Sequence, residues 1–140
     1  MYRMIKQCRV VFVFALVCCL SSVAWAGNDA YLFDVLKKPV YRAAWDAMFR
    51  GEKDIPVWLA EWADKSAGPT SPCKAAVVND VEHMVHFVCK AHECGDNLFI
   101  VFFAPGGKQA WGVLTTESER FFGKPDELMR YALLDARRCE

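Results

Sequence analysis

The sequence predicts an α+β domain, in which an antiparallel sheet is flanked by helices and carries a disulfide-closed protruding loop. Helical periodicity occurs near both ends of the chain, at 39–50 and 125–138. The middle instead carries short apolar runs separated by turn residues, which is typical of antiparallel strands. Two of those runs are separated by a pair of cysteines, Cys89 and Cys94. Because helices and strands are grouped along the chain, the α+β class is favoured over a parallel α/β sheet.

The first 26 residues have the order of a secretory signal peptide. Three basic residues precede an apolar run over 10–20, and small residues follow as far as Ala26. We expect cleavage after Ala26, which leaves one mature domain over 27–140. The apolar run is too short for a comfortable membrane span. The mature protein is therefore expected to be soluble in a bacterial periplasm, without a membrane anchor.

Composition narrows the classes of partner. The chain has 140 residues, of which 54% are hydrophobic and 24% charged, as expected for a single globular domain. Its formal net charge is zero, but removal of 1–26 leaves 14 basic and 17 acidic residues, a net charge of −3. Nucleic-acid binders usually carry a clustered basic surface. The mature domain is thus expected to bind no nucleic acid, and its charge suits a basic partner.

The first part of the mature chain is predicted to be helical. Tyr31 to Leu36 is long enough for one or two helical turns, and a helix begins at Pro39 and runs to Arg50, before Gly51. The face expected to pack on the sheet consists of Val40, Ala44, Ala47 and Met48. The stretch 66–72 is predicted to be a loop from its composition. Core packing is favoured over a sugar-binding platform for three tryptophans in apolar periodic runs: Trp45, Trp58 and Trp62.

The middle of the chain is predicted to form the sheet. Four apolar runs are expected to be its strands: 75–78, 81–89, 98–103 and 110–115. Asn79-Asp80 is a turn signal between the first two, and 105–108 is a hairpin loop before the last. The third run is apolar throughout and is predicted to be a buried central strand. Alternation along 81–89 places His83 and His86 on opposite faces of the sheet.

The last element is predicted to be an amphipathic helix over 125–138. Its acidic first turn, at Asp126-Glu127, and its basic last turn, at Arg137-Arg138, suit the helix dipole. Asp135 is expected to face water. The apolar face is predicted to hold Leu128, Tyr131, Ala132 and Leu134.

Four cysteines remain after the signal peptide: Cys73, Cys89, Cys94 and Cys139. An even number in an exported chain indicates two disulfides in an oxidising compartment. Three connectivities are open, and we favour Cys89 with Cys94 and Cys73 with Cys139. The short ring suits a loop at a strand end, and the long ring would contribute about 4 kcal/mol in the chain-entropy model.

The segment Cys89-Lys90-Ala91-His92-Glu93-Cys94 has nothing to bury. It carries two charges and an imidazole, and its only apolar side chain between the cysteines is Ala91. We therefore expect it to project from the sheet as a stiff tip with His92 at its point.

Three other interpretations of this segment are possible. A metal site could combine Cys89, His92 and Cys94 with His86, residue types that suit zinc, but the spacing is unusual and export favours oxidised thiols. A thiol oxidoreductase is disfavoured by the four-residue spacer. The ring could also only brace a hairpin end in a domain that binds another envelope component. No catalytic triad, phosphate loop or carboxylate pair is evident, so the sequence predicts no enzyme.

The motif Cys-Lys-Ala-His-Glu-Cys-Gly at 89–95 resembles the Cys-Lys-Pro-His-Asp-Cys-Gly loop of the Ivy family, the inhibitors of vertebrate c-type lysozyme. The likeness covers most of the chain, from about Leu32 to about Leu134. This chain departs from the pattern at Ala91 and Glu93. Further matches outside the loop are Ala43-Ala44, Met48, Pro56-Val57-Trp58, Pro72 and 112–116.

The resemblance implies a lysozyme inhibitor that works without a cofactor and has c-type lysozyme as its protein partner. His92 would enter the active-site cleft and hydrogen-bond both catalytic carboxyl groups, while Lys90, Ala91 and Glu93 would contact lysozyme around it. The biological role implied is defence of bacterial peptidoglycan against a host enzyme, which makes the protein a virulence factor. The sequence leaves the oligomeric state open, a homodimer included.

Overall fold

The computed structural model describes residues 30–66, 68–72 and 75–139, so the predicted signal peptide lies outside the described residues. The helices are α1 (Leu32–Val35), α2 (Pro39–Met48), α3 (Val57–Ala60), α4 (Trp62–Lys65) and α5 (Glu127–Asp135), with short 3₁₀ turns η1 (Pro105–Gly107) and η2 (Ala136–Cys139). The strands are β1 (Thr70–Pro72), β2 (Ala76–Val78), β3 (Val81–Cys89), β4 (Leu98–Phe103), β5 (Ala110–Thr115) and β6 (Glu119–Phe122).

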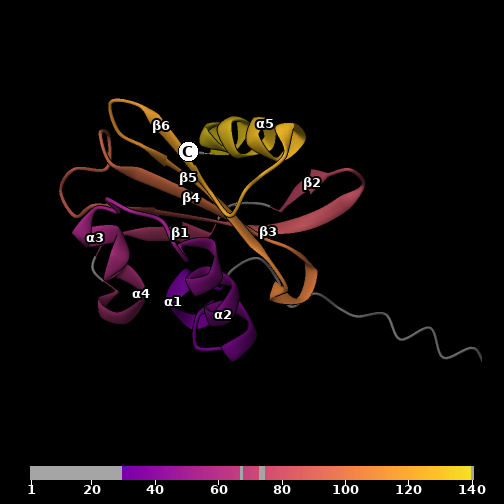
Figure 1. The fold of residues 1–140 in the computed structure, drawn as a ribbon, viewed down its shortest axis with the longest axis horizontal. Helices are drawn as coiled ribbons and strands as arrows, with labels where there is room; N and C mark the ends of the chain where they lie inside the picture. The colour runs from indigo at the N-terminus through magenta and orange to yellow at the C-terminus, as the bar shows by residue number, and fades with distance from the viewer. Residues whose placement is uncertain (1–29, 67, 73–74, 140) are drawn as a thin grey trace, which may run out of the picture.

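These strands form one antiparallel sheet with helices on both sides. Figure 1 shows α1 to α4 on one side of the sheet and α5 on the other. The strand order is β1-β3-β4-β5-β6, and β2 also pairs with β3. β2 pairs with the beginning of β3, at Val81 to His83, and β1 pairs near its end, at His86 to Val88. The predicted α+β class, with helices flanking an antiparallel sheet, is confirmed.

β4 lies at the centre of the molecule. All five residues from Phe99 to Phe103 are fully buried, at 0% exposure. Phe99, Val101 and Phe103 point to the side of α1 to α4, while Ile100 and Phe102 point to the side of α5. Each such side chain contributes about 1.5–3 kcal/mol when buried from water. The apolar run 98–103 therefore forms the buried central strand that the sequence predicts.

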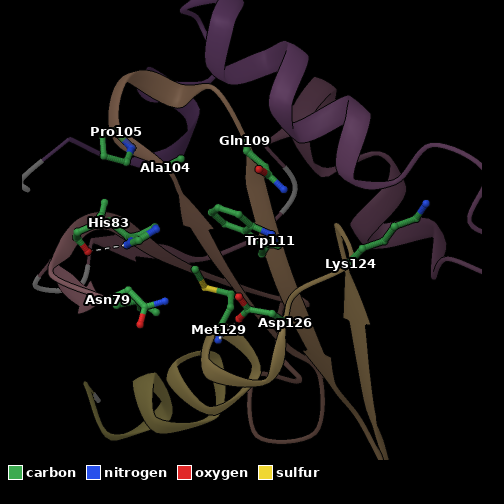
Figure 2. A pocket seen from close by; sticks show the side chains of 11 residues that line it. Asn79, His83, Ala104, Pro105, Gln109, Trp111, Lys124, Asp126 and Met129 are labelled. Atoms are coloured by element: carbon green, nitrogen blue, oxygen red, sulfur yellow. Dashed lines mark hydrogen bonds between the residues drawn. The ribbon is translucent and has the colours of Figure 1, made fainter.

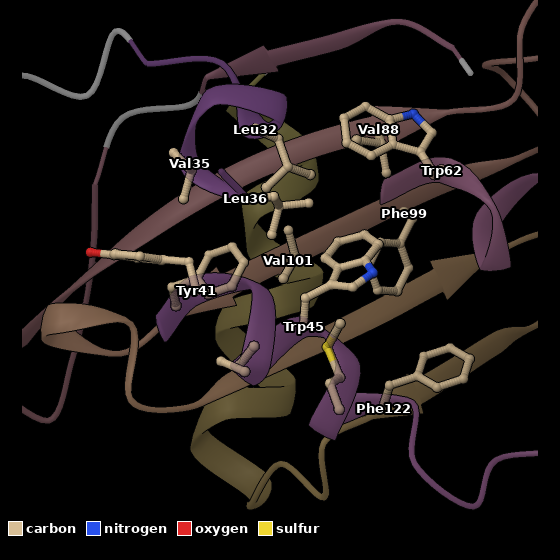
Figure 3. Close-up of a cluster of buried hydrophobic side chains, with 14 of the residues drawn as sticks. Leu32, Val35, Leu36, Tyr41, Trp45, Trp62, Val88, Phe99, Val101 and Phe122 are labelled. Atoms are coloured by element: carbon tan, nitrogen blue, oxygen red, sulfur yellow. The ribbon is translucent and has the colours of Figure 1, made fainter. Parts of the chain in front are cut away.

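The larger core lies between the sheet and α1 to α4. Figure 3 shows Trp45 and Trp62 in this cluster together with Phe99 and Phe122. Trp45 makes an edge contact with Phe99, with ring centroids 5.7 Å apart. Trp45 and Trp62 are at most 2% exposed, and Trp58 packs against the same cluster. The three tryptophans therefore belong to the core, as predicted.

The smaller core lies under α5. This helix begins after Asp126, whose Oδ1 accepts a hydrogen bond from the Met129 backbone N–H over 2.8 Å. A capping carboxylate of this kind satisfies one of the free N–H groups of the first turn. Met129 and Leu133 then pack against Ile100 and Phe102. No helix in the described part of the chain has both the length and the apolar character that a membrane span requires.

The predicted packing face of α2 is partly wrong. Ala44 and Met48 are buried, but Val40 is 46% exposed, and Tyr41 and Trp45 take the inner positions in place of Val40 and Ala47. The two aromatic rings contact β4, since Tyr41 lies 5.3 Å from Phe103 between ring centroids. Aromatic side chains bury the most area, so the helix is rotated by about one residue relative to the aliphatic stripe.

The predicted face of α5 is also partly wrong. Ala132 and Leu134 are partly buried and pack against the smaller core, as predicted, but Leu128 is 56% exposed and Tyr131 is 71% exposed. The centre of the packed face is formed by the buried residues Met129, Leu133 and Ala136, which follow an i, i+4, i+7 spacing. A stripe that begins one residue later makes equally good helical periodicity, so the sequence pattern could not select between the two.

Two strands were not predicted. β1 lies within 66–72, the stretch predicted to be a loop, and β6 occupies 119–122. β1 pairs with the last residues of β3, and the Thr70 hydroxyl donates to the Phe87 carbonyl oxygen over 2.7 Å. β6 pairs with β5 after a tight turn. Both strands are short, with three residues in β1 and four in β6, so their pairing depends on neighbours distant in the sequence rather than on composition.

Candidate functional site

The Cys89–Cys94 loop leaves the sheet from two neighbouring strands. β3 ends at Cys89 and β4 begins at Leu98, and these residues face each other in the antiparallel register. The Lys90 backbone N–H donates to the Asn97 carbonyl oxygen over 3.1 Å and extends the pairing by one step. The residues between, 91–96, are all exposed. The loop thus projects into solvent from a hydrogen-bonded base, as the sequence predicts.

A disulfide closes the loop. Cys89 and Cys94 are bonded, with their Cα atoms 4.9 Å apart. Cys89 is 7% exposed because it belongs to the sheet, whereas Cys94 is exposed. The bond therefore ties the free arm of the loop to a buried strand residue. A loop restricted in this way loses less conformational freedom when it docks on a partner.

The tip of the loop is a β-turn with His92 at its third position. The Glu93 backbone N–H donates to the Lys90 carbonyl oxygen over 3.0 Å. His92 has φ of 66°, while Ala91 is not among the residues with positive φ. A negative φ at the second position followed by a positive φ at the third is typical of a type II turn, in which proline is favoured at the second position. Ala91 occupies that second position, so the turn forms here without the ring constraint.

His92 is exposed, and its imidazole takes part in no hydrogen bond or ion pair of the described residues. Left-handed backbone is uncommon for residues other than glycine, although histidine is among those enriched there. The closed loop holds His92 in this conformation at its outermost point. Both ring nitrogens are therefore available to an incoming partner.

Lys90 and Glu93 pair with each other beside the tip. The Lys90 Nζ atom lies 2.8 Å and 2.7 Å from the two Glu93 carboxylate oxygens. The Asn97 side-chain amide donates to the same carboxylate over 3.3 Å. Both charged side chains are more than a third exposed, so this pair contributes less than about 1 kcal/mol to stability. Its effect is local: it neutralises the flanks of the tip and leaves the imidazole uncovered.

A second segment supports the base of the loop from outside. The Cys89 backbone N–H donates to the Pro69 carbonyl oxygen over 3.2 Å. Gly68 has φ of +145°, and a Cβ atom added there would overlap the Cys89 carbonyl oxygen. Glycine is thus required for this close approach. Sequence reasoning missed this role because 66–72 was predicted to be a plain loop, and only its Gly-Pro pair marked it as special.

The turn between β5 and β6 lies beside the second half of the loop. Together they line a hollow of about 570 Å³, formed by Asp96, Asn97, Thr116, Glu117 and Ser118. Two of these residues are acidic and none is basic. Sequence reasoning missed this neighbour, since nothing in the motif indicates which hairpin lies next to it. The hollow adds negative charge beside the second half of the loop.

The predicted alternative metal ligands are not brought together. Cys89 and Cys94 form a disulfide and offer no thiolate. His86 is 1% exposed, neither ring nitrogen has a hydrogen-bond partner, and burial lowers its pKa to about 4. Within 30–66, 68–72 and 75–139, no three His, Cys, Asp or Glu side chains are grouped so that they could hold a metal ion.

The second predicted disulfide stays a prediction. Cys73 lies outside the described residues, as does the side chain of Cys139.

Comparison with known proteins points to one family. The family model described as "Inhibitor of vertebrate lysozyme (Ivy)" matches residues 40–130, which include the entire loop. A curated "Inhibitor of vertebrate lysozyme" from Pseudomonas aeruginosa is 31% identical over 133 residues, covering 81% of this chain and 84% of that protein. An uncharacterized protein from Yersinia pestis is 32% identical over 87 residues, covering 62% of this chain and 54% of that protein.

The matched region contains α2 from its second residue, α3, α4, β1 to β6 and the first turn of α5, so it includes the whole sheet, most of both cores and the closed loop. The sequence resemblance carried by 89–95 is therefore part of a likeness over most of the chain. On these grounds the chain belongs to the Ivy family of vertebrate lysozyme inhibitors.

Proposed function

We propose that this protein inhibits c-type lysozyme by inserting the Cys89–Cys94 loop into the active-site cleft. The observation that carries the proposal is the position of His92, at the exposed point of a closed turn with both ring nitrogens free. Family membership supports the target class, since the relative from Pseudomonas aeruginosa is named as an inhibitor of vertebrate lysozyme. The protein acts as an inhibitor rather than as an enzyme.

The chemistry of the target explains why an imidazole suits this role. Retaining glycosidases hold two carboxyl groups about 5 Å apart across the scissile bond. One is a protonated acid and the other an anion. A neutral imidazole carries one N–H donor and one bare nitrogen acceptor on different sides of its ring. His92 can therefore donate to the anion and accept from the acid at once, in the place of the scissile bond.

The flanking residues fit a partner with excess positive charge. Lys90 and Glu93 already neutralise each other, so they enter the rim of the cleft without an unpaired charge to desolvate. The Ala91 side chain is small, so it can enter the cleft next to His92. The acidic hollow at Asp96 and Glu117 and the net charge of −3 for 27–140 would attract a basic enzyme and speed association.

The setting completes the proposal. A signal peptide over 1–26 would deliver the protein to the periplasm, where peptidoglycan is the polymer that lysozyme cuts. Blocking the enzyme there would protect the cell wall and aid survival in a host.

A competition assay tests the mechanism. The mature chain, 27–140, is added to a c-type lysozyme with and without a chitotriose that fills the substrate cleft. If the loop takes the place of the substrate, inhibition is competitive and the sugar and the inhibitor exclude each other. Chitotriose that stays bound in the lysozyme cleft of the inhibited complex, or inhibition that does not depend on the sugar concentration, would show that the loop lies outside the cleft.

A further inference from the structure

We propose that a cavity at the opposite end of the sheet is a second binding site, for a neutral sugar. This cavity has a volume of about 420 Å³, within the range of small-ligand pockets. Figure 2 shows the side chains that line it, from the β2–β3 hairpin, the β4–β5 connection and the start of α5. We call it the hairpin cavity. Its polar and aromatic lining includes His83, Trp111, Gln109, Asn79, Lys124 and Asp126.

The hairpin cavity is separate from the Cys89–Cys94 loop. β3 runs from Val81, beside the cavity, to Cys89, at the base of the loop. β4 runs the opposite way, from Leu98 at the loop to Phe103 next to the cavity. A strand rises about 3.3 Å per residue, so the length of β3 lies between the two sites. The cavity and the loop therefore lie at opposite ends of β3.

His83 presents a free acceptor to the cavity. Its side chain is 5% exposed, and its Nδ1 atom lies 2.8 Å from the Val81 carbonyl oxygen. A carbonyl oxygen only accepts, so Nδ1 carries the proton and Nε2 of the neutral ring is an acceptor. No hydrogen bond of the described residues uses Nε2, which, unlike both nitrogens of His86, is not sealed from solvent. Figure 2 shows this second nitrogen turned from Val81 towards the cavity.

A tryptophan forms the wall next to this acceptor. Trp111 is half-buried, and its ring meets that of His83 edge to face, with centroids 5.7 Å apart. The ring is fixed on one side by the core under α5. Its open side is in view at the centre of the cavity in Figure 2. An aromatic face that is held in place and partly open suits the C–H face of a sugar ring.

Polar side chains surround the aromatic wall. The side-chain amides of Asn79 and Gln109 make no hydrogen bond among the described residues, and Asp126 uses only Oδ1, to cap α5. Among the described residues, Lys124 is the one cation that lines the cavity. These groups offer both donors and acceptors, and their formal charges cancel.

This lining selects the chemical class of the ligand. A wholly apolar ligand would leave Nε2 of the buried His83 unpaired, and it would cover the exposed amides of Asn79 and Gln109 without replacing their hydrogen bonds to water. A phosphate ester would meet one lysine against one carboxylate, which gives no net attraction. A sugar has one apolar face and several hydroxyls that both donate and accept. It is the class that can satisfy Trp111, His83 and the amides together.

A titration followed by NMR tests the assignment. The mature protein labelled with ¹⁵N is titrated with glucose or N-acetylglucosamine up to about 100 mM, beyond the millimolar range in which weak ligands bind. We expect saturable shifts of the Trp111 indole N–H and of the Gln109 and Asn79 side-chain amides. The indole signals of Trp45, Trp58 and Trp62 are internal controls, because these rings line no part of the cavity.

Two variants locate the site. Trp111→Leu should weaken sugar binding at least about tenfold through loss of the aromatic face, and Gln109→Ala should weaken it without affecting the fold, since Gln109 is exposed. Both should inhibit lysozyme as the parent does, and His92→Ala should bind sugar as the parent does. Absence of sugar shifts at Trp111, or shifts there only with phosphate or the dipeptide Gly-Leu, would overturn the proposal while leaving the inhibitor function intact.

Discussion

His92 and His86 are the same side chain in opposite surroundings. His92 is exposed at φ of 66°, whereas His86 is 1% exposed and packs edge to face against Phe103. His83, between them in exposure, keeps one nitrogen for the Val81 carbonyl oxygen. The three histidines therefore differ in what their ring nitrogens can do, and two of them lead to separate predictions at this scale.

The first prediction concerns the imidazole at the tip. His92→Ala should weaken inhibition of c-type lysozyme at least about thirtyfold, because loss of a buried charge-paired contact costs about 2 kcal/mol or more. The melting temperature should not change, since the exposed side chain makes no hydrogen bond or ion pair with any described residue. His92→Asn is the matched control, because asparagine tolerates positive φ. If His92→Asn inhibits like the parent, the shape of the turn rather than the imidazole carries the binding.

The second prediction concerns the pH dependence of stability. Burial lowers the pKa of His86 from 6.5 to about 4, so the unfolded chain binds a proton between these values and the folded chain does not. Stability is unaffected above pH 6.5 and falls as the pH drops towards 4, by about 2 kcal/mol at pH 5. His86→Leu should remove this part of the loss. Urea unfolding at pH 7.5 and pH 5 measures it, and an equal loss in both proteins would contradict the assignment.

At the scale of one element, the loop is braced in three independent ways. The disulfide closes it, the Lys90–Glu93 pair spans the turn, and the Pro69 carbonyl oxygen holds its base. The ion pair is exposed and weak, so the covalent bond and the backbone contacts determine the shape. Two predictions follow from the different costs of removing these constraints.

The disulfide should matter more for binding than for folding. Replacement of Cys89 and Cys94 by Ser should lower the free energy of unfolding by about 2 kcal/mol, the chain-entropy value for so small a ring. Inhibition should weaken by a larger free energy, more than about thirtyfold, because the open loop loses its freedom on docking. Calorimetry and inhibition constants measured on the same samples decide this. Equal losses, or an intact inhibition constant, would count against preorganisation.

The turn itself can be improved. Proline is favoured at the second position of a type II turn, and the Ala91 backbone N–H donates no hydrogen bond among the described residues. Ala91→Pro should raise the free energy of unfolding by about 0.4–1 kcal/mol and tighten inhibition a few-fold. Ala91→Gly, which loosens the same position, should act in the opposite direction. A destabilised Ala91→Pro protein would show that the turn is not of this type.

At the scale of the whole molecule, the sheet is the part on which both proposed sites depend. Its two sides are covered by separate cores, and β4 is buried on both. β5 must pass very close to β4, since a Cβ atom on Gly112 would overlap the Phe99 ring. Because the overlap is deep inside, an added methyl group there affects the entire fold rather than one site.

This overlap gives the fifth prediction. Gly112→Ala should destabilise the protein by about 1–3 kcal/mol, the usual cost of overpacking a core. The fraction that stays folded should inhibit lysozyme normally, because Gly112 lies away from the loop. Gly95→Ala is the matched control, since nothing lies within 4 Å of a Cβ atom at that position. A stable Gly112→Ala protein would mean that the Phe99 ring can move.

Much of this architecture could be predicted from the sequence because its signals are local. The strand 98–103 and the closed loop are marked locally, by an unbroken apolar run and by the spacing of Cys89 and Cys94. The helix beginning at Pro39 has an equally local start signal, and Asn79-Asp80 forms the predicted turn, with φ of 51° and 59°. Local signals of this kind are sufficient when the residues that make the structure are neighbours in the chain.

The remaining features depend on residues far apart. The strand at Thr70–Pro72 forms only because the end of β3 is there to pair with it, and the role of Gly68 exists only because Cys89 approaches it. The orientation of α5 is set by the shape of the core beneath it rather than by its own periodicity. His92 was found because its motif is local, whereas the hollow at Glu117 and the hairpin cavity are assembled from segments that no motif connects.

The Lys90 to Asn97 hydrogen bond marks the boundary between the sheet and the exposed tip of the loop. On one side of this bond the backbone is held by the pairing of β3 with β4. On the other side, the six residues 91–96 are exposed and contribute nothing to either core. Apart from Cys94, whose disulfide stabilises the fold, those positions can consequently vary at little cost to folding, so that a lineage could change its target enzyme by exchanging the tip alone. The same boundary makes this domain a scaffold onto which a foreign cyclic peptide could be grafted in place of the tip.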